Sequence, residues 1–236
     1  MSTLVAPTSV GSATATLHLT QILVAYEDAV RLLRIRDTYD WHQRVWEAFG
    51  GRNGQTRDFL IRVDRKEEAF RVLILSRSLP AKPDWCPTDC FGTKVVPDDY
   101  FAHARYRFSL LANPTKKIRS DKAGERTKNG RRVPVTQREE LIAWLVRKAE
   151  AGGFAVILKR EDDSGKEVEV LRTIPRGREF FHKDRATHGT HTAVEFQGEL
   201  TVTDPAQFRA TVASGIGSAK AFGFGLLVIA PVSTLD

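Results

Sequence analysis

The sequence predicts an α+β fold with two ferredoxin-like domains in tandem, and three observations support this prediction. Short stretches in which apolar residues alternate with period two indicate strands along most of the chain. Segments predicted to be helical interrupt these strands in both halves of the chain. The order of helices and hairpin-like pairs is similar in the two halves, which is the pattern of a repeated β/α unit, although no close sequence repeat links them.

The first half predicts a strand, a helix, a hairpin and a later strand. The strands are expected at 17–24, 59–63, 70–74 and 106–110, and the helix lies between the first two. We place the domain boundary near Asn113-Pro114, which gives an N-terminal domain over 17–113 and a C-terminal domain over 114–236. Residues 1–16 are rich in Ser, Thr, Ala and Gly and are expected to form a flexible extension outside both domains.

The second half also alternates helices with hairpin-like pairs of strands, but its first predicted element is a helix. Thr136 and Glu139 have the spacing of a capping box before the segment LIAWLVRKAEAGG, which two glycines end. Asp204 with Pro205 is typical of the start of a short helix. Strands are expected at 154–160, 168–174, 192–202 and 225–232, the first two of them flanking a turn.

Composition and charge narrow the possible partners. The chain has 236 residues, 42% of them hydrophobic, a formal net charge of +7 and a pI near 9.6. This balance favours a polyanionic partner, either a nucleic acid or an anionic membrane surface. The apolar run Leu226–Ala230 is far short of the ~20 residues of a spanning helix, and the N-terminus has no basic region of a signal peptide. With only Cys86 and Cys90, the chain is expected to be cytoplasmic, with free thiols.

The segment TYDWHQRVWEAFGG, at 38–51, places a histidine on the apolar face of a helix. On a helical wheel His42 falls between Phe49 and Trp46, with Tyr39 close on the same surface. A histidine in this position can be a packed core residue, or a general acid or base on the rim of a groove, because its unperturbed pKa lies near neutrality. The helix alone leaves both interpretations open.

The segment KKIRSDKAGERTKNGRR, at 116–132, holds eight lysines and arginines against two acids. Asn129-Gly130 indicates a tight turn, so the segment is expected to be a long exposed hairpin or loop. Such a run can be an ordinary solvated surface, but the net charge of the chain favours an element that grips phosphates. The candidates for contact with RNA or DNA here are Lys116, Lys117, Arg119, Arg131 and Arg132.

The segment SGIGSAKAFGFGLL, at 214–227, is rich in glycine but fits neither a Walker A loop nor a dinucleotide fingerprint. Its glycines allow close approach of the backbone, either to another part of the protein or to a phosphate chain. Gly215, Gly217 and Lys220 are therefore further candidates for nucleic-acid contact, beside the alternative of tight packing.

These segments together resemble the CasE family of CRISPR repeat-processing endoribonucleases of type I-E systems, within the RAMP superfamily. The resemblance covers about residues 17–232 and rests on motifs in a fixed order: YDWHQRVW, RDFLIRV, ANPTKK, RRVPV, IAWLVRKAEAGGF, FQGELTVTDP and GIGSAKAFGFGLLVIAP. It implies two RRM-like domains that face each other across a cleft. It also implies cleavage at the base of a CRISPR repeat hairpin and assembly into the Cascade surveillance complex.

The resemblance further implies that His42 and Tyr39 carry the reaction, with no metal or cofactor. The 2′-hydroxyl beside the scissile phosphate would attack it and leave a cyclic 2′,3′-phosphate. His42 should then be open to the RNA, and a nearby cation should stabilise the phosphorane. Some relatives carry a basic residue where this chain has Gln43, and some an arginine where it has Leu111, which leaves the identity of that cation open.

Two other functions remain as alternatives. The same fold could serve as a non-catalytic RNA-binding subunit, which would need neither His42 nor Tyr39. The pair Cys86 and Cys90, or the three histidines His182, His188 and His191, could hold a metal in a nucleic-acid protein. No second cysteine pair is present, and we expect the histidines to lie in a basic loop near RNA.

Overall fold

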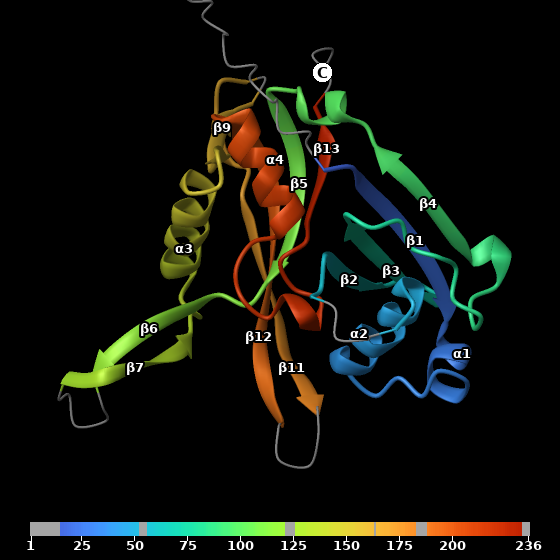
Figure 1. The fold of residues 1–236 in the computed structure, drawn as a ribbon. Coiled ribbons are helices and arrows are strands. Elements are labelled where there is room, and N and C mark those ends of the chain that lie inside the picture. The colour runs from blue at the N-terminus through green and yellow to red at the C-terminus, as the bar shows by residue number, and fades with distance from the viewer. Residues whose placement is uncertain (1–14, 52–55, 121–125, 163, 183–187, 233–236) are drawn as a thin grey trace, which may run out of the picture.

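The computed structural model describes residues 15–51, 56–120, 126–162, 164–182 and 188–232 (Figure 1). Its helices are α1 Tyr26–Arg31, α2 Thr38–Trp46, α3 Arg138–Glu150 and α4 Pro205–Ser214, with the short 3₁₀ segments η1 Glu47–Phe49, η2 Thr88–Cys90, η3 Asp98–Phe101 and η4 Lys220–Phe222. Its strands are β1 Leu17–Ala25, β2 Phe59–Arg65, β3 Ala69–Ser76, β4 Phe91–Val96, β5 Arg105–Ala112, β6 Thr115–Ser120, β7 Arg126–Pro134, β8 Phe154–Ile157, β9 Lys159–Glu161, β10 Glu167–Glu169, β11 Arg172–His182, β12 His188–Val202 and β13 Leu227–Pro231.

The first sheet has the antiparallel order β2-β3-β1-β4. Its strands β1, β2 and β3 lie where the period-two pattern predicted them. Side chains alternate between the two faces of β2, so Phe59 and Ile61 face the core under α2 while Leu60 and Arg62 face the second sheet. The N-terminal sheet is therefore buried on both faces along β2.

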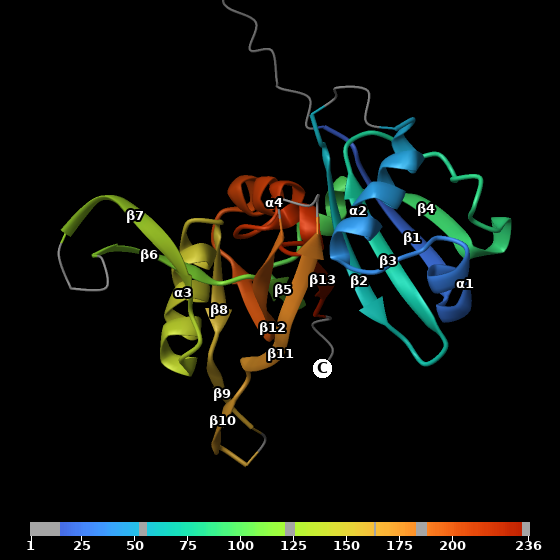
Figure 2. The same cartoon turned by 90° about the horizontal axis from the view of Figure 1, so that it is seen from below.

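The second sheet has the order β11-β12-β5-β13, with β8 beside the end of β12. The strand β5, which a boundary at residue 113 would assign to the first domain, pairs here with β12 and β13. Sheet pairing therefore divides the chain between β4 and β5. The views from two directions show the two sheets side by side, with α3 and α4 on the second one (Figures 1 and 2).

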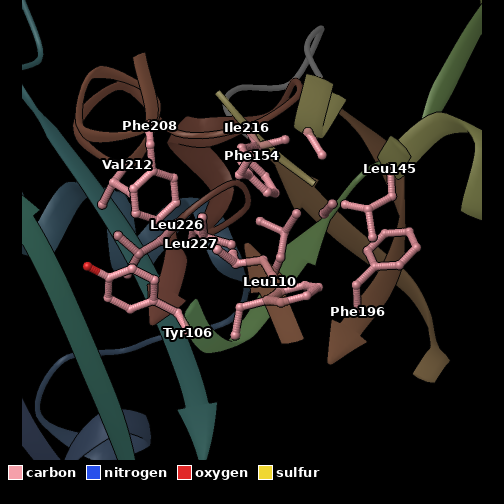
Figure 3. Packing of buried hydrophobic residues seen from close by; sticks show 14 of the residues in the cluster. Tyr106, Leu110, Leu145, Phe154, Phe196, Phe208, Val212, Ile216, Leu226 and Leu227 are labelled. Carbon is pink, nitrogen blue, oxygen red and sulfur yellow. The ribbon is translucent and has the colours of Figure 1, made fainter. Parts of the chain in front are cut away.

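One hydrophobic cluster joins the two sheets (Figure 3). It contains Tyr106 and Leu110 of β5, Trp144 of α3 and Phe208 of α4, and it extends to Leu60 of the first sheet. Burial of apolar side chains from elements far apart in the sequence is a large source of folding stability. It fixes the orientation of the sheets on which the site is built.

The basic segment forms the hairpin β6–β7, which projects away from the body of the protein (Figure 1). The prediction of an exposed hairpin is confirmed, but the prediction of a turn at Asn129-Gly130 is wrong, because both residues lie within β7. In the register of the hairpin, Lys117 is opposite Arg132. The residues that join the strands, 121–125, lie outside the described residues.

Two local predictions are also wrong. The residue that precedes α3 is Gln137, and no side-chain capping bond forms there, so Thr136 and Glu139 make no capping box. His182 is the last residue of β11, His188 is the first residue of β12, and His191 lies within β12, so none of them belongs to a loop.

Cys86 and Cys90 are free thiols, as predicted. Among the described residues no helix has the length and the apolar character to cross a membrane.

Candidate active site and RNA-binding surface

The helix α2 carries the candidate catalytic pair, and its start is fixed by Asp37. One carboxylate oxygen of Asp37 accepts the backbone N–H groups of Tyr39 at 2.8 Å and Asp40 at 3.1 Å, which satisfies two donors of the first turn. The other oxygen accepts the backbone N–H of His182 at 2.8 Å. Asp37 therefore also ties α2 to β11 of the second sheet.

The predicted apolar face of this helix is confirmed. Trp41, His42, Val45 and Trp46 are buried, whereas Gln43 is only partly so. The rings of Tyr39 and His42 lie side by side, with their centroids 6.2 Å apart. The helical wheel therefore correctly predicted that Tyr39 and His42 are neighbours on one surface of α2.

The expectation that the imidazole of His42 is open to RNA is wrong for this structure. Only 4% of His42 is exposed, and its ring contacts that of Phe59 at a centroid distance of 5.8 Å. Its Nε2 accepts the indole N–H of Trp46 at 3.1 Å, which places the proton of a neutral ring on Nδ1. An apolar helix face cannot show how deeply tertiary contacts, such as that with Phe59 of β2, bury the ring.

The glycine-rich segment lies against α2 through η4. The ring of Phe222 is 6.1 Å from that of Tyr39, measured between centroids. Lys220, in the same turn, donates from Nζ to the backbone oxygen of Ser214 at 2.7 Å. Burial lowers the pKa of Lys220, and the nearby charges of Arg57 and Lys148 lower it further. The predicted residue Lys220 therefore supplies a cation in the turn that packs against α2.

Arg57 is a cation that the sequence analysis missed. Burial lowers its pKa, and its Nη1 is buried without a hydrogen-bond partner among the described residues. A buried guanidinium nitrogen without a partner is costly, which favours an anionic ligand for it. The only sequence signal was its place in the motif RDFLIRV, two residues before Phe59, which contacts His42.

The two glycines predicted to contact RNA have different surroundings. A Cβ at Gly215 would lie 2.9 Å from the backbone oxygen of Gly225, so this glycine serves close packing within the protein. Gly217, with φ +85°, packs against Trp144 and also lines a cavity. Tight packing, the alternative left open above, thus accounts for Gly215.

The five predicted cations of the hairpin are exposed but not equivalent. Lys116 forms an ion pair with Glu140 of α3 at 2.5 Å. Lys117 and Arg132 line the same cavity as Gly217. Arg119 and Arg131 face solvent without lining it. The hairpin therefore presents cations both to solvent and to a cavity at its base.

A second cluster of charges, between the two sheets, was not foreseen. Arg62 of β2 donates to Glu195 of β12 at 2.8 Å, and both side chains are buried. They form the floor of a cavity of about 780 Å³ that Arg65, Lys66 and Arg178 also line. Single charged residues within alternating strands gave no signal that they would meet across 133 positions of the chain.

The fold and the site define a class of α+β proteins with two ferredoxin-like domains, a basic hairpin and a Tyr–His helix packed against a glycine-rich segment. Residues 17–231 match the family described as "CRISPR associated protein". The chain belongs to this family, and within it to the group of Cse3 and CasE proteins. The predicted fold class is confirmed by these relatives.

Two curated relatives and two solved structures illustrate the similarity. The Cascade subunit CasE of Escherichia coli K12 is 32% identical over 204 residues, which are 84% of this chain and 94% of the relative. The endoribonuclease Cse3 of Thermus thermophilus is 30% identical over 210 residues, 84% and 92% of the two chains. A structure of the endoribonuclease Cse3 bound to a 19-nucleotide RNA has a TM-score of 0.67 at 27% identity, and Cas6e of E. coli K-12 has 0.63 at 30%; each covers 92% of this chain and 100% of its own.

Proposed function

We propose that this protein is an endoribonuclease that cleaves CRISPR precursor transcripts at the base of the repeat hairpin and stays bound to the product as a Cascade subunit. The observation that carries the proposal is the pair Tyr39 and His42 on α2, packed against the segment that bears Lys220. The relatives support it, because their names and structures describe a CRISPR endoribonuclease, a bound RNA and a Cascade subunit.

The proposed reaction needs no metal. The 2′-hydroxyl beside the scissile phosphate loses its proton and attacks the phosphorus, and the bond to the 5′-oxygen of the next nucleotide breaks. The products are a cyclic 2′,3′-phosphate and a 5′-hydroxyl, which takes up a proton. One imidazole can accept the first proton or supply the second, and either role is typically worth ~10²–10⁴ in rate. The hydroxyl of Tyr39 would hold the phosphate or assist this proton transfer.

The cations beside α2 would stabilise the charge that develops on the phosphorane. Lys220 and Arg57 are both partly buried, where a fixed positive charge acts more strongly than in water. They replace the basic residue that some relatives carry after the histidine. Because only 4% of His42 is exposed, the proposal requires RNA binding to uncover the ring.

The burial of His42 also favours a second candidate function, a non-catalytic subunit that binds the RNA hairpin. In that case the Trp46–His42 hydrogen bond is purely structural. The two functions predict the same RNA affinity and differ only in cleavage.

The test is cleavage of the repeat RNA from the protein's own genome in EDTA, by wild type and by the variants His42→Ala and His103→Ala. His103 is an exposed histidine in the N-terminal half of the chain and serves as the matched control. We expect wild type and His103→Ala to cut, and His42→Ala to bind the hairpin without cutting it. Undiminished cutting by His42→Ala would overturn the catalytic assignment, and binding without cutting by wild type would leave the second function. A single 2′-deoxy nucleotide before the scissile phosphate should block the reaction.

A further inference from the structure

A cavity of about 300 Å³ lies where the basic hairpin, α3 and the glycine-rich segment meet. The hairpin contributes Lys117 and Arg132, and α3 contributes Lys148. The segment before η4 contributes Gly217 and Ser218, and the start of the hairpin adds polar groups of Asn113 and Thr115. Neither Tyr39 nor His42 lines this cavity, so it is separate from the candidate catalytic pair.

Among the described residues, no acidic group balances the charges in this cavity. The described part of its lining holds three cations and no carboxylate. None of the three forms an ion pair within the part of the chain that the structure describes, although Lys116 on the same strand pairs with Glu140 and Arg138 on the same helix pairs with Glu169. Like charges gathered without partners repel one another, and a polyanionic ligand relieves this repulsion.

The base of the cavity is rigid. Trp144 is 4% exposed and stacks with Phe196 at 6.0 Å, and Gly217 packs against its ring. Asn113 is 7% exposed, and its Nδ2 donates to Nδ1 of His191 at 3.1 Å. Burial lowers the pKa of His191, which favours the neutral form that can accept this bond. The side chain of Asn113 is therefore held in place before a ligand arrives.

We propose that this cavity is a phosphate-binding subsite for the RNA backbone, and that Lys148 is one of its ligands. The proposal rests on the function proposed above and adds a contact from α3, outside the hairpin and the glycine-rich segment. Three converging cations and an amide suit a backbone phosphate, which accepts several charge-assisted hydrogen bonds at once. Lys148 also lies near Lys220, so the subsite adjoins the cation next to α2.

The test compares Lys148→Ala with Arg147→Ala, its exposed neighbour on α3, which does not line the cavity. The probe is the repeat RNA with a 2′-deoxy nucleotide before the scissile phosphate, and its affinity is measured across a range of salt concentrations on both sides of the physiological value. Loss of one phosphate contact should weaken binding about fivefold near physiological salt and reduce the slope of log K against log [salt] by about 0.9. We expect this for Lys148→Ala and not for Arg147→Ala, and Lys148→Arg should restore most of the affinity.

A second measurement locates the contact. RNAs with a single methylphosphonate, each lacking one negative charge, should include one that weakens binding to wild type but not to Lys148→Ala. Equal affinities and slopes for the two alanine variants would overturn the proposal. So would normal RNA binding by Lys148→Ala together with a loss of Cascade assembly, because the cavity would then hold a protein partner. Failure of wild type to bind repeat RNA at all would instead refute the proposed function.

Discussion

The carboxylate of Glu195 should control the acid stability of the whole protein, because it lies between the two sheets. Its side chain is only 6% exposed. Burial alone would raise its pKa, but hydrogen bonds from four side chains outweigh this effect and lower the pKa to about 2, from an ordinary value of 4.5. The donors are Gln197 at 2.9 Å, Arg176, Ser109 at 2.8 Å and Arg62 at 2.8 Å.

The change to make is Glu195→Gln, which keeps the shape of the side chain and removes its charge. A group whose pKa is depressed in the folded state stabilises it above the unfolded pKa, and this stabilisation is lost as the pH falls through the folded pKa. The shift from 4.5 to about 2 corresponds to about 3 kcal/mol of unfolding free energy. Wild type should therefore lose roughly this amount between about pH 5 and about pH 2, and Glu195→Gln should already lack it near neutral pH.

The assay is urea unfolding followed by intrinsic fluorescence, at neutral pH and at several steps down through this acid range. The control is Glu199→Gln, on the same strand, whose carboxylate pairs with Arg105 and Arg160, side chains that are 47% and 57% exposed. Pairs to such exposed partners are worth about 0.2–1 kcal/mol, so this variant should stay close to wild type at neutral pH. The reasoning is refuted if Glu195→Gln shows the same acid dependence as wild type, or if the two variants are equally destabilised.

Three further predictions concern the site and its supports. Asp37→Ala removes both capping bonds of α2, so it should destabilise the protein by about 1–2 kcal/mol in urea unfolding and should also slow cleavage; unchanged stability would contradict the capping role. Tyr39→Phe should reduce single-turnover cleavage by about 10²-fold while hairpin affinity stays within about twofold, and a large loss of affinity instead would make it a binding residue. Gly225→Ala should lower the free energy of unfolding by about 2 kcal/mol more than Gly223→Ala does. Both glycines have positive φ, but a Cβ at Gly225 would lie 2.6 Å from the backbone oxygen of Ile216, whereas a Cβ at Gly223 would have no described atom within 4 Å. Equal unfolding midpoints for the two variants would refute this prediction.

Local sequence patterns determined most of the elements. Alternation with period two located β1, β2 and β3, because one face of each strand meets a core regardless of what lies beyond it. Asp204 and Pro205 correctly marked the start of α4, where the carboxylate accepts the N–H of Gln207 at 3.0 Å. The helical wheel correctly predicted that Tyr39 and His42 lie on one face of α2, since the position of a residue around a helix depends only on helix geometry.

Only the tertiary structure decided how these elements meet. Alternation in 106–110 predicts a strand but cannot say which sheet it joins, and β5 pairs with β12 and β13 of the second sheet. The depth of His42, the meeting of Arg62 with Glu195 and the convergence of Lys148 with the hairpin all depend on contacts between distant segments. Such contacts leave no periodic signal in one sequence, because each partner satisfies its local pattern equally well without the other.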